Sequence, residues 1–67
     1  MKRVKRNTKY YFIIIANGTG LILSDIETYK VIDKERFDAG NYFADKPVAI
    51  DVANKIKQLF LDNKNNN

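Results

Sequence analysis

The chain has 67 residues and a formal net charge of +4, and it contains neither cysteine nor histidine. A chain of this length forms at most one small domain, which buries only about 60% of the surface that its unfolded state exposes. The missing cysteines exclude disulfides and thiolate zinc sites, and the missing histidines remove the usual general base and the commonest metal ligand. We therefore expect a protein that is not an enzyme and holds no metal or cofactor.

The positive charge is concentrated at the N-terminus. Residues 1–9 contain five bases and no acid, and these bases are Lys2, Arg3, Lys5, Arg6 and Lys9. The rest of the chain carries the other seven of the 12 basic residues against all eight acidic ones, so we expect a nearly neutral folded body. Residues 1–8 are predicted to form a basic arm, which phosphates and anionic surfaces attract. Two interpretations remain open, a solubilising leader and a nucleic-acid contact.

Residues 10–16 predict a β-strand, because they are almost all aromatic or β-branched. Asn17-Gly18 follows, a pair that readily adopts the positive φ angles of a tight turn. Residues 21–23 then resume the apolar pattern. We predict a β-hairpin centred on residues 17–20.

A basic segment followed by an apolar one is also the pattern of a signal peptide. The apolar run is only seven residues long, however, whereas about 20 are needed to span a bilayer. Removing it would leave too little chain to form a core. We expect a cytoplasmic protein that acts inside a host cell.

The predicted first strand is apolar on both of its faces. One face carries Tyr10, Phe12 and Ile14, and the other carries Tyr11, Ile13 and Ile15. One helix covers only one face of a sheet, so the second face either contacts a partner or leaves tyrosines half exposed with wet hydroxyls.

The pattern weakens between residues 24 and 38. Residues 29–32 are compatible with a third strand, and Asp33 is a competent N-cap for a short helical turn that reaches Phe37. The acids Asp33, Glu35 and Asp38 lack the spacing and glycine of a calcium loop, so we expect a solvated face there.

A C-terminal helix is clearly predicted. Asp45 can cap it, and Pro47 fits its first turn. Its apolar stripe consists of Ala49, Val52, Ala53, Ile56, Leu59 and Phe60. Ile50 and Leu61 lie off this stripe and form an exposed apolar shoulder. Residues 63–67 show no periodicity and are expected to be a disordered polar tail.

The predicted architecture is therefore a single α+β domain over residues 9–62. Two or three antiparallel strands form a small sheet, and the C-terminal helix packs on one of its faces.

A short motif precedes this helix. Arg36, Gly40, Asn41, Tyr42 and Phe43 read R-x-x-x-G-N-Y-F, with Ala49 in the helix that follows. This arrangement resembles a type of small uncharacterised phage protein from phages that infect low-G+C Gram-positive bacteria. The resemblance implies a phage or mobile-element origin and a sheet-plus-helix fold, and no activity comes with it. The chain departs from the pattern at residues 46–48, where such proteins carry a Thr-x-Glu-Glu cap.

We predict an accessory protein that binds another protein, a host or defence factor that it inhibits, because the apolar surface exceeds what so small a monomer can bury. The expected contact residues are Tyr11, Ile13, Ile15, Ile50 and Leu61. A homodimer would use the same surface. The alternative is a nucleic-acid contact through Lys2, Arg3, Lys5, Arg6, Lys9 and Tyr10.

Overall fold

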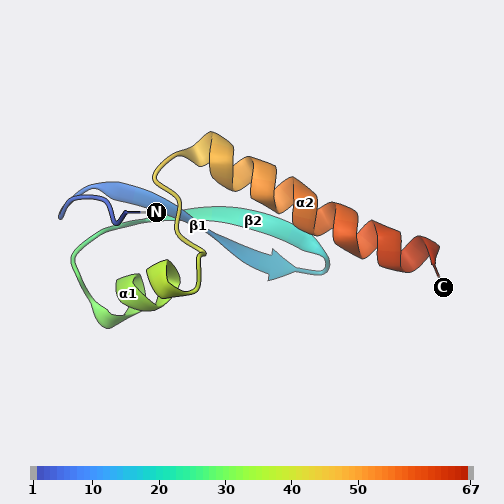
Figure 1. The fold of residues 1–67 in the computed structure, drawn as a ribbon, viewed down its shortest axis with the longest axis horizontal. Coiled ribbons are helices and arrows are strands. Elements are labelled where there is room, and N and C mark those ends of the chain that lie inside the picture. The colour runs from blue at the N-terminus through green and yellow to red at the C-terminus, as the bar shows by residue number, and fades with distance from the viewer. Residues whose placement is uncertain (1, 67) are drawn as a thin grey trace.

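A two-stranded antiparallel sheet lies between two helices in the computed structural model, which describes residues 2–66. In chain order the elements are β1 (Lys9–Ala16), β2 (Thr19–Ile26), α1 (Val31–Asp38) and α2 (Lys46–Asn65). Figure 1 shows the long helix α2 running along the hairpin, with α1 on the other side near the end where the chain enters β1. The predicted α+β class, with a small antiparallel sheet and a C-terminal helix, is confirmed.

The turn of the hairpin fixes how the two strands face each other. Ala16 pairs with Thr19, and the two residues between them have positive φ angles, 53° at Asn17 and 77° at Gly18. A two-residue loop with both φ values positive is the type I′ turn that suits the twist of antiparallel strands. The predicted hairpin is confirmed, and its register sets Ile15 opposite Gly20.

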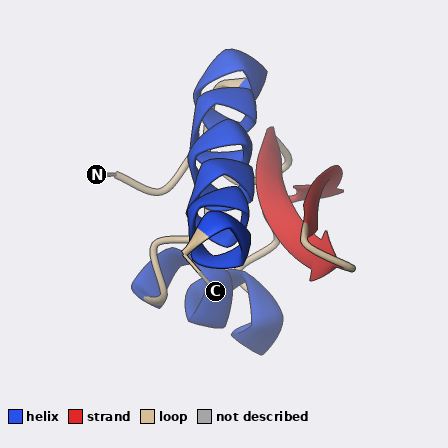
Figure 2. Ribbon diagram, turned by 90° about the vertical axis from the view of Figure 1, so that its right-hand side faces the viewer, coloured by secondary structure: helices blue, strands red, loops and turns tan. Residues whose placement is uncertain are grey.

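One face of the hairpin is covered by α2 (Figure 2). Gly20 on this face is so close to the helix that an added Cβ would lie 3.0 Å from the Cβ of Ala53. Ala49 and Ala53 are buried at this contact. Two small helical residues above a glycine let the helix and the sheet approach closely, because only alanine methyl groups separate the two backbones.

The opposite face carries the aromatic core. Tyr10 and Phe12 on β1 pack against Tyr42, whose ring stacks on that of Tyr10 at 4.3 Å between centroids. Phe37 of α1 meets Tyr42 edge to face at 5.3 Å, and Val4 completes the cluster. The short helix α1 therefore covers the half of this face that lies away from the turn.

The predicted third strand over residues 29–32 is wrong. Tyr29 has a φ of 60°, which interrupts the extended chain, and α1 begins at Val31. Asp33 is the third residue of α1 and not its N-cap. Its carboxylate accepts hydrogen bonds from the backbone N–H groups of Thr28 and Lys30, and these bonds fold the chain back into a helix.

Residues 40–43 take the place of the third strand. Gly40 has a φ of 78° and ends α1, with its N–H bonded to the carbonyl of Phe37. The Asn41 side chain accepts the N–H of Ile13 at 2.7 Å and donates to its carbonyl at 2.8 Å. Phe43 then exchanges two backbone hydrogen bonds with Tyr11, both 2.8 Å long. The outer edge of β1 is thereby paired from Tyr11 to Ile13.

Both chain ends differ from the predicted arm and tail. Val4 packs against the core, its N–H bonds the Tyr42 hydroxyl, and the Asn7 N–H bonds the carbonyl of Glu27, so the N-terminal segment lies on the folded body. At the other end α2 continues through Asn65, so residues 63–65 are helical. The last residue of the predicted tail, 67, lies outside the described residues.

The Gly40→Ala substitution tests the helix ending. We expect it to lower the free energy of unfolding by about 1–2 kcal/mol, because L-residues resist a positive φ. An added Cβ meets no atom within 4 Å, so strain in the backbone is the only cost. Urea unfolding followed by circular dichroism measures the change. Gly40→Asn is the control and should lose less, and an unchanged Gly40→Ala protein would contradict the interpretation.

Candidate functional site

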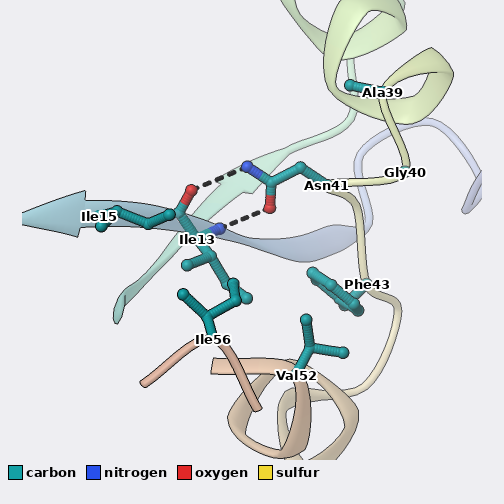
Figure 3. A pocket seen from close by; sticks show the side chains of 8 residues that line it. All are labelled: Ile13, Ile15, Ala39, Gly40, Asn41, Phe43, Val52 and Ile56. Carbon is teal, nitrogen blue, oxygen red and sulfur yellow. Dashed lines mark hydrogen bonds between the residues drawn. The ribbon is translucent and has the colours of Figure 1, made fainter. Parts of the chain in front are cut away.

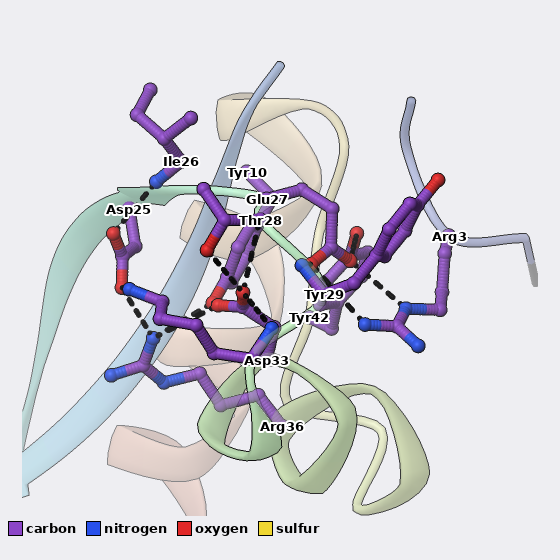
Figure 4. A network of polar contacts seen from close by, with 11 residues as sticks. Arg3, Tyr10, Asp25, Ile26, Glu27, Thr28, Tyr29, Asp33, Arg36 and Tyr42 are labelled. Carbon is purple, nitrogen blue, oxygen red and sulfur yellow. Dashed lines mark hydrogen bonds and ion pairs between the residues drawn. The ribbon is translucent and has the colours of Figure 1, made fainter. Parts of the chain in front are cut away.

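A network of buried charges connects β1, α1 and the loop between β2 and α1 (Figure 4). Asp33 is fully buried and accepts a short hydrogen bond from the Tyr10 hydroxyl. That hydroxyl also accepts a hydrogen bond of 2.7 Å from the Arg36 guanidinium. Arg36 in turn donates to Asp25 at 2.8 Å and lies 3.8 Å above the ring of Phe12.

Glu27 is the second buried carboxylate. Arg3 donates to both of its oxygens, at 2.9 and 3.2 Å, and the Tyr42 hydroxyl donates at 2.8 Å. The backbone N–H of Tyr29 adds a further bond at 3.0 Å. Arg3, expected to be part of a free basic arm, is therefore an internal counter-ion.

The surroundings of these groups shift their pKa values. Burial alone would raise the pKa of Asp33, but hydrogen bonds from Tyr10, Thr28 and Lys30 outweigh it and hold that pKa well below its usual range. Burial opposes ionisation of Glu27 too, yet the bonds from Arg3 and Tyr42 leave its pKa lowered. Burial, followed by the bond to Asp33, raises the pKa of Tyr10 to about 12.

This network is structural. Every buried side-chain nitrogen and oxygen atom in residues 2–66 has a hydrogen-bond partner, so none is left to bind a ligand. The same residues contain no group of three His, Cys, Asp or Glu side chains suited to a metal ion. The network joins the N-terminal segment and α1 to the sheet.

An open apolar groove lies on the other side of β1 (Figure 3). Its volume is about 250 Å³, and it runs between the end of β1, the segment after α1 and the helix α2. The lining residues are Ile13, Ile15, Ala39, Gly40, Asn41, Phe43, Val52 and Ile56. The amide of Asn41, its most polar group, is already bonded to Ile13. The groove offers shape and apolar contact without a reactive group.

A second apolar surface lies on the aromatic face of the sheet, beyond the end of α1. Ile14 and Leu21 pair across the strands, and Leu23 lies two residues along β2 on the same face. These three side chains are 45%, 48% and 40% exposed, and we call them the open face. Together they form an apolar patch on the face of the sheet away from α2.

The five predicted contact residues do not form one surface. Tyr11, Ile13 and Ile15 lie on the face that α2 covers, and Ile13 is only 7% exposed. Ile15, however, is 51% exposed and lines the groove, whereas Ile14 on the opposite face of β1 is 45% exposed. The predicted contact residues on β1 thus lie beneath or beside α2, which packs on the face that contains Gly20.

Ile50 and Leu61 lie on one flank of α2. At 100° per residue, both fall about 60–80° to one side of Ala53, whereas Val52 and Ile56 fall about 60–100° to the other side. Val52 and Ile56 line the groove beside β1, so Ile50 and Leu61 lie toward the free edge of β2. Each is 41% exposed, in agreement with the predicted shoulder.

The predicted nucleic-acid residues divide into exposed and committed side chains. Lys2, Lys5, Arg6 and Lys9 are exposed. Tyr10 is fully buried, so its ring cannot stack on a base. Arg3 is bound to Glu27, and both Arg3 and Arg6 lie 4.9 Å from the ring centre of Tyr29. The exposed bases therefore remain accessible, but Tyr10 cannot be the aromatic residue that contacts a base beside them.

Comparison with models of protein families, with curated proteins and with solved structures found no match to this chain. Neither α1 nor α2 is long and apolar enough to cross a membrane, which holds for residues 2–66.

The Asp33→Asn substitution tests the buried network. The folded-state pKa values of Asp33 and Glu27 are lowered, so their stabilising contribution is complete above the unfolded values near 4 and is lost as the pH falls. We expect Asp33→Asn to lower the free energy of unfolding at pH 7 by about 2 kcal/mol and to flatten its decline between pH 5 and pH 2.

Urea unfolding at several pH values measures both effects. Asp38→Asn is the control, because Asp38 forms an exposed pair with Lys34 and should change stability by less than about 0.5 kcal/mol. A pH dependence of Asp33→Asn that equals that of the wild type would contradict the assigned role.

Proposed function

We propose that this protein acts by binding another protein through the open face of its sheet. The observation that carries the proposal is the contiguous, half-exposed set formed by Ile14, Leu21 and Leu23. Charged residues are depleted at the centre of protein interfaces, and the chain has no charged residue from position 10 to position 24. The surface thus combines apolar contact with low desolvation cost.

A binding role also agrees with the use of the charged groups. The buried acids Glu27 and Asp33 are fully engaged in holding the fold together. The groove beside β1 is lined by apolar side chains and by the engaged amide of Asn41. The resemblance of the R-x-x-x-G-N-Y-F motif to phage proteins supports a host protein as the partner. The present chain would inhibit the activity of that host protein.

A capture experiment tests this function. The immobilised wild-type chain is incubated with a lysate of a low-G+C Gram-positive bacterium, and bound proteins are identified by mass spectrometry. We expect the Leu21→Lys/Leu23→Lys double variant to bind the captured protein at least about tenfold more weakly, because a charge in an apolar contact costs more than 1.4 kcal/mol. The control is Val48→Lys/Leu59→Lys, which places the same charges at exposed positions of α2.

The same experiment decides between protein and nucleic acid. Nuclease treatment and the Lys2→Gln/Lys5→Gln variant remove a nucleic-acid bridge without disturbing Arg3 or Val4, which support the fold. The proposal is supported if capture survives nuclease treatment and the Lys2→Gln/Lys5→Gln substitutions but is lost in the Leu21→Lys/Leu23→Lys variant. Capture that disappears with nuclease, or that the open-face variant retains in full, contradicts it.

A further inference from the structure

The outer edge of β2 is open. Tyr10, Phe12 and Ile14 of β1 pair with Asp25, Leu23 and Leu21, while Tyr11 and Ile13 use their backbone groups on the opposite side. Hydrogen bonding alternates along an antiparallel ladder. The N–H and C=O groups of Gly20, Ile22 and Ser24 must therefore point away from β1.

The unpaired part of this edge ends before Ile26. Within residues 2–66, no hydrogen bond reaches those outward groups of Gly20, Ile22 and Ser24. At the next outward residue, Ile26, the N–H is bonded to the side chain of Asp25 at 2.7 Å. Natural edge strands are usually protected by charges, prolines or bulges, and residues 17–24 contain no charge and no proline. The edge is thus suited to accept another strand.

We infer that a second copy of this chain adds to β2, so that two hairpins form one four-stranded antiparallel sheet around a two-fold axis at Ile22. The three open residues are spaced symmetrically about Ile22. Gly20 of one copy then meets Ser24 of the other, and Ile22 meets Ile22, so every outward group finds a partner in a closed dimer.

The positions of the helices allow this pairing. Ala53 lies over Gly20 of β2 with Ile13 of β1 beside it, so α2 touches both strands of its own hairpin and lies closer to β2. Two copies joined at β2 therefore place their helix axes at most two strand spacings apart, about 9.6 Å. Packed helices lie about 8–10 Å apart. The first two turns of each helix, residues 46–52, lie side by side on the same face of the joined sheet.

The contact between the helices is also specified. The helix runs toward the turn while β2 runs away from it, because Ala53 lies over Gly20 and Phe60 lies beside Gly18. Moving two strand residues from Gly20 to Ile22 covers about 6.6 Å, which equals about four helical residues. The axis thus passes near Ala49, so Ile50 faces Ile50 of the second copy. Leu61 lies on the same flank but far beyond this contact.

This inference deepens the proposed function and rests on it for its biological meaning. On the face of the joined sheet opposite the two α2 helices, Leu21 of one copy lies opposite Leu23 of the other. The open faces of the two copies become one continuous apolar surface, with α1 at either end. Dimerisation would therefore complete the partner-binding surface.

Analytical ultracentrifugation over a range of concentrations tests the dimer. We expect the wild type to approach twice the chain mass of 7.8 kDa. The Ser24→Pro variant should associate at least about tenfold more weakly, because proline removes the outward N–H and blocks an added strand. Ser24→Ala retains that N–H and should dimerise like the wild type. Far-UV circular dichroism confirms that each variant is folded.

A second pair of variants keeps the test decisive if Ser24→Pro does not fold. Ile50→Glu introduces two like charges at the axis and should weaken association at least about tenfold. Leu61→Glu is the matched control, since Leu61 has the same 41% exposure on the same flank. It should dimerise normally.

Each outcome separates the dimer from the function. A wild type that stays monomeric at all concentrations overturns the inference, and so does a dimer that Ile50→Glu and Ser24→Pro leave intact or that Leu61→Glu disrupts. If such a protein still captures a host protein through Leu21 and Leu23, the proposed function stands without the dimer. A dimer disrupted by the edge variants supports the inference, even where no host protein is captured.

Discussion

The close contact between Gly20 and Ala53 decides the layout of this protein. Only a glycine beneath a small helical residue lets α2 approach the hairpin so closely, and a side chain at position 20 would push the helix away. Since Gly20 shares its face with Ile13 and Ile15, this contact commits that face to α2. The remaining face is left to α1, which is too short to cover it. The open face is thus a direct consequence of where one glycine lies.

The buried charges explain how so small a body holds its second helix. The chain buries few large apolar side chains, and two carboxylates, Glu27 and Asp33, are fully enclosed among them. Glu27 accepts hydrogen bonds directly from Arg3 and Tyr42. Asp33 accepts one from the Tyr10 hydroxyl, which in turn accepts one from Arg36. Removing one member of such a network leaves an uncompensated buried charge. These bonds thereby fix the N-terminal segment and α1 in place on the sheet.

The R-x-x-x-G-N-Y-F motif has an architectural role throughout. Gly40 ends α1, Asn41 imitates a strand by pairing its amide with the backbone of Ile13, and Phe43 completes the pairing at Tyr11. The Asn41 amide offers both an N–H donor and a carbonyl acceptor, as a peptide group does, so it bonds the carbonyl and the N–H of Ile13. The motif therefore closes the outer edge of β1, and β2 keeps the free edge.

The sequence by itself determined the α+β class, the hairpin turn and the C-terminal helix, because each depends on local chemistry: Asn17-Gly18 in a tight turn, and an apolar stripe at helical spacing. The turn also fixed Gly20 opposite Ile15, and with the small stripe on α2 this register could have identified the covered face. Tertiary structure decided that Val31 and Ile32 lie in a helix and not in a third strand, since the Asp33 carboxylate that bonds the nearby N–H group of Thr28 is itself held by the hydroxyl of Tyr10, 23 residues away in sequence. It also docked the N-terminal bases, because the partner of Arg3 lies 24 residues away in sequence.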